Sequence, residues 1–331
     1  MKKIMNSLNE IAEYLKSTDN SVILTHQYPD GDTLGSAFAL CRALRKLGKK
    51  SRVIVNGELP KKFEYLAKGM EEQDFEYRTV AAVDIASVSL FGELKDEFEN
   101  IVDVSIDHHA MNIPFAKMTY VNADAAANTE NVYRLIKILG VEIDREIANC
   151  IYTGLCTDTG CFKFTNVTPD TMRIAADLME IGCDSAWINR VMFDTKSMAR
   201  IRMERAVLNT LTTHCSDKIA VIYTTLAMEK ETGAKDSDMD GLAAIPRQIE
   251  GVVIGITIKE KGENHFRVSV RTLDGYSAAD ICRNFGGGGH LAAGGCAIDG
   301  TLEDVKEKLL KAAEQELNFG ECNYGRNNCS K

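Results

Sequence analysis

One short stretch of the sequence combines an imidazole with two carboxylates. The segment VILTHQYPDGDTLGS, residues 22–36, runs from an apolar stretch into His26, and Asp30 and Asp32 follow on either side of a glycine. Asp-Gly-Asp after a strand is common turn chemistry. This stretch alone therefore leaves two interpretations open, a polar turn or part of a metal site.

Three further segments place residues of the same kinds at the ends of apolar stretches. Asp84 ends the run AAV, the triplet Asp107, His108 and His109 follows VSI, and Asp158 lies in CTDTG after an apolar helical pattern. Four of the 6 histidines fall in these motifs or in a later GGGGH run, which turn preferences do not explain. In a mostly parallel sheet, ligand sites lie beyond the carboxyl ends of the strands, so we expect these side chains to converge at one edge.

Carboxylates with some imidazole are the ligands that Mn²⁺ or Mg²⁺ prefers, and they also suit Co²⁺ or iron. A structural zinc site would instead use thiolates. Six or seven donors are too many for one ion. Two ions about 3.5–4 Å apart that share a carboxylate would use them all, so we expect a two-metal site.

Alternating strand and helix patterns predict the scaffold that positions these residues. Strands are predicted at SVILT, RVIV, AAVDIAS and VSIDHH, and helices at 34–47, at NTENVYRLIKILG with Asn128 or Thr129 as its cap, and at EIANCIYTGLCTDTG. A further helix has Pro169 at its start and Gly182 past its end. This alternation predicts an α/β fold whose mostly parallel sheet carries helices on both faces.

The pattern changes in the second half of the chain. The segment 185–214 is predicted to be helical and bridging, KIAVIYTT a strand, and EGVVIGITIKEKGENHFRVSVRT a hairpin. SAADICRNF and TLEDVKEKLLKAAEQEL are predicted helices, the second with a start close to a capping box, and CAID is a short strand. We expect a catalytic domain at 1–190, a helical linker at 191–215 and a smaller α+β substrate-binding domain at 216–331.

Composition narrows the class of protein. The 331 residues suggest two domains, and no apolar run reaches the ~18 residues of a membrane span. The 10 cysteines form no CxxC pair, which indicates thiols in a reducing compartment, so we expect the cytoplasm. The net charge of -9 favours a small or short ligand over a long duplex.

The N-terminal segment predicts an amphipathic helix with Ile4, Leu8, Ile11 and Leu15 on one face. Together with the acidic surface, this helix is a candidate homodimer contact.

Taken together, the motifs resemble those of the DHH phosphoesterase superfamily. Asp107-His108-His109 resembles its signature, THQYPDGDTLGS its first motif, AVDIAS its second and GLCTDTGCFKF its fourth. NFGGGGHLAAGG resembles the glycine-rich motif of the associated C-terminal substrate-binding domain. The order and spacing match over nearly the whole chain, and the compact size resembles the branch of oligoribonucleases and 3′-phosphoadenosine 5′-phosphate phosphatases, the nanoRNases.

By this resemblance, two divalent metal ions are expected, with Mn²⁺ first and Mg²⁺ or Co²⁺ as alternatives. The first ion would be held by His26, Asp30 and Asp84. The second would be held by Asp32, Asp84, His108 and Asp158, with Asp84 as the bridge. Asp107 would orient a ligand histidine, and His109 would face the substrate phosphate or the leaving oxygen.

The resemblance also implies a site that holds the terminal phosphate of the substrate. Its members would be Arg271, Gly287, Gly288, Gly289 and His290. Four glycines alone are more often a flexible hinge, and the run lacks the Lys-Ser or Lys-Thr of a nucleoside-triphosphate loop. The run instead suits backbone amides wrapped round an anion. The family usually has a serine after the arginine, whereas this chain has Thr272, which leaves the fine geometry open.

The resemblance implies a phosphodiesterase and phosphatase that hydrolyses short oligoribonucleotides to mononucleotides and dephosphorylates 3′-phosphoadenosine 5′-phosphate. The first domain would cut, and the second would capture the far end of a short substrate. Two alternatives stay open. One is a phosphodiesterase of linear or cyclic dinucleotides, and the other is a catalytically silent, metal-dependent binding protein, which would lack some ligand positions.

Overall fold

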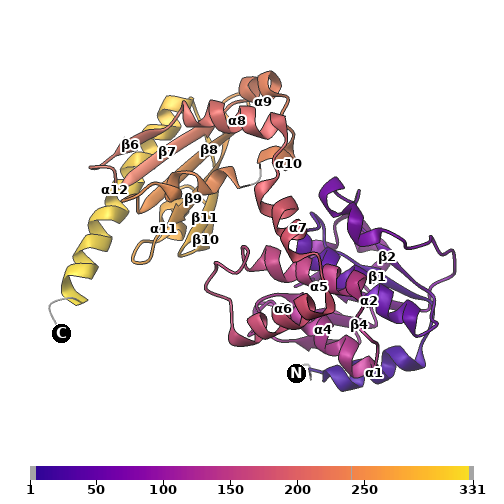
Figure 1. Cartoon of the computed structure of the whole chain (residues 1–331). Helices are drawn as coiled ribbons and strands as arrows, with labels where there is room; N and C mark the ends of the chain where they lie inside the picture. The colour runs from indigo at the N-terminus through magenta and orange to yellow at the C-terminus, as the bar shows by residue number, and fades with distance from the viewer. Residues whose placement is uncertain (1–4, 240, 328–331) are drawn as a thin grey trace. The chain divides into compact units, whose positions relative to one another are not determined.

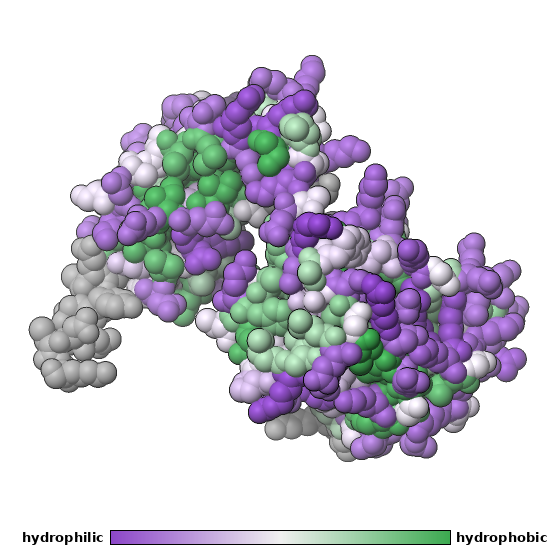
Figure 2. All heavy atoms as spheres, viewed as in Figure 1, coloured by the Kyte–Doolittle hydropathy of each residue, from purple (hydrophilic) through white to green (hydrophobic). Residues whose placement is uncertain are grey.

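The computed structural model describes residues 5–239 and 241–327. The chain divides into two compact units, the first ending at Thr195 and the second beginning at Lys196 (Figure 1). Hydrophilic side chains cover most of the face seen in Figure 2, with apolar patches on both units. None of the described helices combines the length and the apolar character needed to cross a bilayer.

The first unit is built on a parallel sheet, which among the described residues has five strands in the order β2-β1-β3-β4-β5. Its strands are β1 (Ser21–Leu24), β2 (Ser51–Ile54), β3 (Thr79–Val83), β4 (Val104–Asp107) and β5 (Met118–Val121). The sequence predicts the first four but misses β5. Three of its four residues are apolar, but only Thr119 is buried, so the apolar positions of this edge strand do not mark a core face.

Helices cover both faces of this sheet, which confirms the predicted α/β fold (Figure 1). They are α1 (Leu8–Ser17), α2 (Gly31–Lys46), η1 (Lys61–Ala67), η2 (Val88–Leu94), α3 (Lys95–Phe98), α4 (Asn128–Leu139), α5 (Arg145–Asp158), α6 (Pro169–Ile181), α7 (Ser185–Asn189) and η3 (Arg190–Asp194). Alternate strand residues point to opposite faces. Ile23 therefore packs into the large core under α2, α4 and α5, and Val22 packs into a smaller core with Phe91 and Phe98.

Helix α1 differs from its prediction in where it begins and what it contacts. It starts at Leu8 with Ser7 as its cap, and residues 5–7 are not helical. Its apolar side chains, Leu8, Ile11 and Leu15, are buried in the core of the first unit. That face is therefore not available to a second copy of the chain, and the predicted Ile4 lies outside the described residues.

The second unit contains a mixed sheet with the strand order β10-β11-β9-β8-β7-β6 in its described part. Its elements are α8 (Met198–Leu208), β6 (Thr212–His214), β7 (Ile219–Thr224), α9 (Leu226–Thr232), α10 (Asp236–Met239), η4 (Leu242–Ala244), η5 (Pro246–Gln248), β8 (Ile254–Gly262), β9 (His265–Thr272), α11 (Ala278–Arg283), β10 (Gly288–His290), β11 (Ala293–Asp299) and α12 (Leu302–Asn327). The antiparallel β8–β9 hairpin and the Thr301–Asp304 cap of α12 confirm two predictions. The stretch 191–215 holds α8 but also β6, the outer strand of this sheet.

Candidate functional site

The turn that follows β1 carries the first three candidate ligands. His26 is largely buried, and Asp30 caps α2, where its Oδ1 accepts hydrogen bonds from the backbone N–H groups of Asp32 and Thr33 at 3.0 and 3.1 Å. Asp32 lies in the first turn of α2 and is fully buried. The capping requirement of α2 therefore fixes Asp30 next to His26 at the carboxyl end of β1.

Asp84 follows β3 directly and is 3% exposed. Its φ of 59° lies in the left-handed region, which residues with a side chain seldom adopt. The backbone is held there because the N–H of Asp84 donates to the carbonyl oxygen of Ile106 at 2.9 Å. Backbone strain of this kind gathers at functional sites.

Two groups of donor atoms share the Asp84 carboxylate. In the first, His26 Nε2 lies 3.7 Å from Asp30 Oδ1 and 3.7 Å from Asp84 Oδ2. In the second, His108 Nε2 lies 3.5 Å from Asp84 Oδ1. The same nitrogen lies at 3.7 and 3.4 Å from carboxylate oxygens of Asp32 and Asp158. Donors that bind one ion at about 2.1 Å are themselves roughly 3–4 Å apart, so these spacings suit shared cations.

The histidine tautomers fit the same interpretation. His26 Nδ1 lies 2.7 Å from the carbonyl oxygen of Gln27, and His108 Nδ1 lies 3.1 Å from that of Ala125. A carbonyl only accepts hydrogen bonds, so each Nδ1 carries the proton and each Nε2 turns a lone pair toward the carboxylates. A lone pair that faces carboxylate oxygens is repelled unless a proton or a metal cation lies between them.

Asp84 supplies an independent test of whether these residues suit a divalent cation. Its Oδ1 is buried and accepts no hydrogen bond from any described residue. An acceptor left without a partner in the protein interior is unfavourable. A divalent cation between Asp84 and His108 would satisfy that oxygen.

Crowding of the carboxylates shows in their pKa values. Burial, and then the charge of Asp32, raises the pKa of Asp84 well above its usual range. Burial, followed by the charges of Asp32 and Asp30, raises the pKa of Asp158 to about 9. Burial likewise raises the pKa of Asp32. These carboxylates therefore ionise together only when positive charge is brought among them.

Asp32 has a second partner that the sequence did not indicate. Its carboxylate accepts the backbone N–H groups of Asn128 and Thr129 at 2.5 and 2.9 Å. The prediction that Asn128 or Thr129 caps α4 is therefore wrong. The N-cap position is Ala127, which has no side-chain oxygen, and the cap is supplied by a residue of α2. A long-range contact of this kind cannot be recognised from local spacing.

A close helix contact places Asp158 at the site. A Cβ atom on Gly154 of α5 would lie 2.4 Å from the Thr129 side chain and 2.6 Å from Asp32 Oδ1. Only glycine allows α5 to approach this closely. Asp158, at the end of α5, thereby comes within 3.4 Å of His108 Nε2.

Asp107 is fully engaged by hydrogen bonds. Its Oδ1 accepts His109 Nδ1–H at 2.7 Å and the His108 backbone N–H at 2.8 Å, and its Oδ2 accepts the Asn112 amide at 2.6 Å. Asp107 therefore orients the ring of His109, whereas the sequence led us to expect that it orients a ligand histidine. The hydrogen bond that His109 donates to Asp107 raises the pKa of His109, whose ring is 45% exposed and whose Nδ1 lies 3.6 Å from Asp84.

Asn112 is a site residue that sequence reasoning missed. Its amide also donates to the carbonyl oxygen of Ile85 at 3.3 Å, so it ties the loop after β4 to the segment after β3. The asparagine lies three residues past His109, yet its type alone does not distinguish it from an ordinary turn residue.

In the second unit, strand register brings Arg271 and His290 to the same face of the sheet. Ala293 of β11 is paired with His290 of β10 on one side and with Arg271 of β9 on the other. Directly opposed residues project from one face, so the arginine and the histidine flank Ala293.

The glycine-rich run is not the loop that the sequence predicted. Gly288–His290 form the edge strand β10, and Gly287 precedes it. A Cβ atom on Gly289 would lie 2.3 Å from the carbonyl oxygen of Ala293, and its φ is 145°. Glycine is thus required for close strand pairing. An edge strand still presents N–H groups on its open side, where an anion could bind them.

The buried hydroxyl of Thr272 links two turns of the second unit. Its Oγ1 lies 3.0 Å from the carbonyl oxygen of Tyr276 and 2.8 Å from that of Leu291, and the residue is 2% exposed. The hydroxyl holds these turns together and does not reach solvent. The replacement of the usual serine by threonine therefore leaves the exposed face of β9 unchanged.

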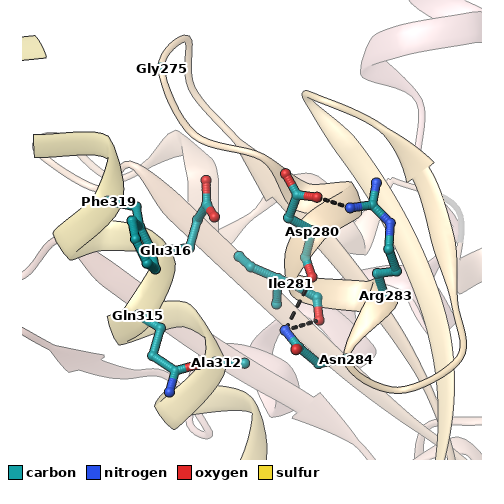
Figure 3. A pocket seen from close by; sticks show the side chains of 9 residues that line it. All are labelled: Gly275, Asp280, Ile281, Arg283, Asn284, Ala312, Gln315, Glu316 and Phe319. Atoms are coloured by element: carbon teal, nitrogen blue, oxygen red, sulfur yellow. Dashed lines mark hydrogen bonds and ion pairs between the residues drawn. The ribbon is translucent and has the colours of Figure 1, made fainter. Parts of the chain in front are cut away.

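A separate pocket opens between α11 and α12 (Figure 3). Figure 3 shows the Asp280 carboxylate paired with the Arg283 guanidinium and the Asn284 amide bonded to carbonyl groups of α11. These polar groups are satisfied by one another, and neither Arg271 nor His290 lines the pocket. We assign no substrate to it.

Comparison with known proteins covers both units. The chain matches the DHH family, N-terminal domain, over residues 20–155 and the DHHA1 domain over residues 217–318. It is 34% identical, over 93% of both chains, to the bifunctional oligoribonuclease and PAP phosphatase NrnA of Thermus thermophilus.

Two solved structures share the fold. An exopolyphosphatase-related protein from Bacteroides fragilis, 25% identical, matches 97% of this chain and 100% of its own with a TM-score of 0.86. RecJ from Thermus thermophilus, in complex with Mn²⁺, is 16% identical and matches 95% of this chain and 56% of its own with a TM-score of 0.58. The chain therefore belongs to the DHH phosphoesterase family, in the branch that includes NrnA.

Proposed function

We propose that this chain is a two-metal phosphoesterase that hydrolyses short oligoribonucleotides to mononucleotides and dephosphorylates 3′-phosphoadenosine 5′-phosphate. The observation that carries the proposal is the Asp84 carboxylate, shared by two groups of donor atoms and left with an unpaired buried oxygen. The activities named for the NrnA relative, which is similar over 93% of this chain, support the choice of substrates.

The ligand set follows the two donor groups. One divalent cation would bind His26, Asp30 and Asp84, which lie close enough together for one ion. The other would bind Asp32, His108 and Asp158, with Asp84 shared through its 3.5 Å contact with His108. Mn²⁺ is the expected ion, with Mg²⁺ or Co²⁺ as alternatives. When bound, such a pair offsets the charge of the phosphate and supplies a nucleophilic water at neutral pH.

His109 is proposed to protonate the leaving group, and Asp107 is proposed to orient His109 for this transfer. Asp107 accepts the Nδ1–H of His109, so the Nε2 of this partly exposed ring is free to face a substrate. The same hydrogen bond raises the pKa of His109, which favours a protonated ring near neutral pH. His109 would donate that proton to the leaving sugar oxygen.

The second unit is proposed to hold the terminal phosphate of the substrate. Arg271 offers a planar guanidinium suited to bidentate phosphate contact, and His290 lies beside it across Ala293. Gly287, Gly288 and Gly289 would contribute backbone N–H groups. A substrate held at one end and cut at the other is selected by its length, which favours short oligomers.

The cellular location and the oligomeric state of the protein are also part of the proposal. We infer a cytoplasmic enzyme from the cysteines, whose spacing suits a reducing compartment. A homodimer stays a prediction, and α1 no longer supports it because its apolar face is buried.

A substrate panel tests the proposal. Mn²⁺-dependent turnover is measured on RNAs from dinucleotides to about twenty nucleotides, on 3′-phosphoadenosine 5′-phosphate, and on a linear and a cyclic dinucleotide. A chelator-treated sample is the control. Fast loss of the shortest RNAs with phosphate release is expected. Preference for the cyclic dinucleotide would indicate second-messenger hydrolysis instead, and metal binding without turnover would favour a silent binding protein.

A further inference from the structure

A large aromatic side chain stands in solvent between two candidate metal ligands. Tyr28 lies two residues after His26 and two before Asp30, and it is 86% exposed. Its φ is 62°, in the left-handed region. Pro29 follows, and a residue before proline is driven toward extended backbone conformations. Both rules disfavour this backbone for a tyrosine.

The stability of the protein does not account for the residue type at position 28. Glycine or asparagine adopts a left-handed φ with less strain than tyrosine. An aromatic ring stabilises a fold by burial, and a ring that is 86% exposed contributes little. The turn needs the φ, since it brings His26 and Asp30 together, but it does not need the ring. A contact outside the chain would explain the tyrosine.

Other exposed apolar side chains border the same edge of the sheet. Met111 and Ile113, in the loop after β4, are 83% and 66% exposed, and Phe164, in the loop after α5, is 56% exposed. The Ile113 N–H donates to the carbonyl oxygen of Ala86, two residues past Asp84, at 2.8 Å. Exposed apolar side chains therefore lie on the loops that follow elements carrying the carboxylates and imidazoles.

The chemistry of this border selects its ligand. The carboxylate of Asp30, two positions away in the same turn, disfavours an acidic peptide, which carries negative charge without a phosphate that the centre would bind. A lipid headgroup carries a phosphodiester but offers no flat aromatic group to the tyrosine ring. An oligonucleotide presents a phosphate flanked by flat apolar bases. An exposed aromatic ring next to the phosphate site is the arrangement on which bases stack in single-strand binding.

We propose that Tyr28 is the stacking platform for the nucleobase next to the phosphate that is cut. The inference rests on the proposed function and adds a source of substrate preference to it. Every base has a flat face, so stacking on Tyr28 accepts any sequence, and it requires a base that is not paired in a duplex. The site would therefore act on unpaired ends.

A cycle of two protein variants and two substrates tests the stacking contact. Tyr28→Asn removes the ring at a residue type suited to the φ, and Tyr28→Phe keeps it. Each is assayed on an RNA dinucleotide and on the same molecule with an abasic ribose next to the cut phosphate. In the wild type and in Tyr28→Phe, loss of the base should lower kcat/KM about ten-fold. In Tyr28→Asn it should change little, while thermal unfolding stays at or above the wild-type temperature.

The outcomes separate this inference from the proposed function. If Tyr28→Asn discriminates between the two substrates as the wild type does, the stacking contact is overturned, although wild-type turnover upholds the function. If the wild type cleaves no RNA, the proposed function fails. The contact is then judged with a dinucleotide that carries fluorescent 2-aminopurine. Quenching in the wild type that is lost in Tyr28→Asn supports stacking, and equal signals overturn it.

Discussion

The candidate metal centre and the candidate phosphate site are built in opposite ways. In the first unit, backbone groups of other elements hold the functional side chains. The N–H groups of α4 hold Asp32, and the carbonyl of Ala125 holds the ring of His108. In the second unit, His290 lies on an exposed edge strand, and Arg271 bonds only to the carbonyl oxygen of Val270 among the contacts described for its side chain.

This difference matches what each site would have to do. Metal ligands must be held close to productive geometry before the substrate arrives. A site that captures the ends of different short substrates needs accessible groups that can adjust. Damage to the first site should therefore abolish metal binding and turnover, whereas damage to the second should weaken substrate binding and leave the metals in place.

The largest effect is expected from Asp84→Asn. The neutral amide cannot serve as a carboxylate shared by two cations, so we expect Mn²⁺-dependent turnover to fall about a thousand-fold or more. The metal-free variant should be at least as stable as the wild type, since it lacks a buried carboxylate among like charges. Turnover and metal content by mass spectrometry measure the first effect, and thermal unfolding measures the second.

Asp103→Asn is the matched control for a buried aspartate. Asp103 lies outside the donor groups, where it accepts the Val80 N–H at 2.9 Å and Lys117 Nζ at 2.7 Å. This variant should lose stability and keep both its metal content and its kcat. Near-normal turnover in Asp84→Asn would remove Asp84 from the metal assignment.

A smaller effect is expected from Arg271→Gln. Hydrogen bonds to charged groups contribute about 1.5–3 kcal/mol, so KM for short RNAs should rise about ten- to hundred-fold while metal content stays the same. Arg267→Gln is the control, because Arg267 lies four residues earlier on β9 and so projects from the same face. Loss of metal in Arg271→Gln would contradict the division of work between the two units.

Asn112→Ala should have a milder effect, confined to the first site. Without its amide, Asp107 loses the hydrogen bond at Oδ2 and holds His109 less firmly. A loss of about ten-fold in kcat is expected, with little change in KM or metal content. An unchanged kcat would mean that Asp107 is positioned without Asn112.

Much of this architecture could be predicted from the chain because the chemical residues follow regular elements. His26, Asp84 and Asp107 each end an apolar strand, and parallel pairing brings strand ends together regardless of loop detail. The family was predictable because its motifs are resembled in order along the chain, and the α/β fold was predictable because strand and helix patterns alternate.

What escaped prediction depends on contacts between distant segments. The cap of α4 comes from Asp32, 96 positions before Asn128, and the hold on His109 depends on Asn112, whose type suits any turn. The Gly288–His290 edge strand escaped because glycine has weak strand propensity, and only pairing with β11 fixes it. Edge strand β5 escaped because its run is only four residues long, and its apolar residues are half-buried at the sheet edge while Thr119 is the buried one.

The last expected effect concerns stability and not activity: removal of the metals should make the stability of the protein depend on pH. The pKa of Asp158 is about 9 in the folded chain, that of Asp84 is raised well above its usual range, and an unfolded aspartate titrates near pH ~3.9. Between these limits the folded metal-free protein holds more protons than the unfolded chain. Its stability must therefore fall as pH rises, by up to ~1.4 kcal/mol per pH unit for each retained proton.

Bound cations replace those protons, so the stability of the metal-loaded protein should not fall as pH rises over this range. The difference in unfolding temperature between loaded and chelated samples should thus widen by about ten degrees from about pH 6 to about pH 8.5 for one retained proton. Asp84→Asn should flatten the metal-free curve, because one of the crowded carboxylates is gone. Arg271→Gln should leave the curve unchanged. A metal-free unfolding temperature that rises over this range would show that the carboxylates are already ionised without cations, and that the electrostatic contrast between the two sites is wrong.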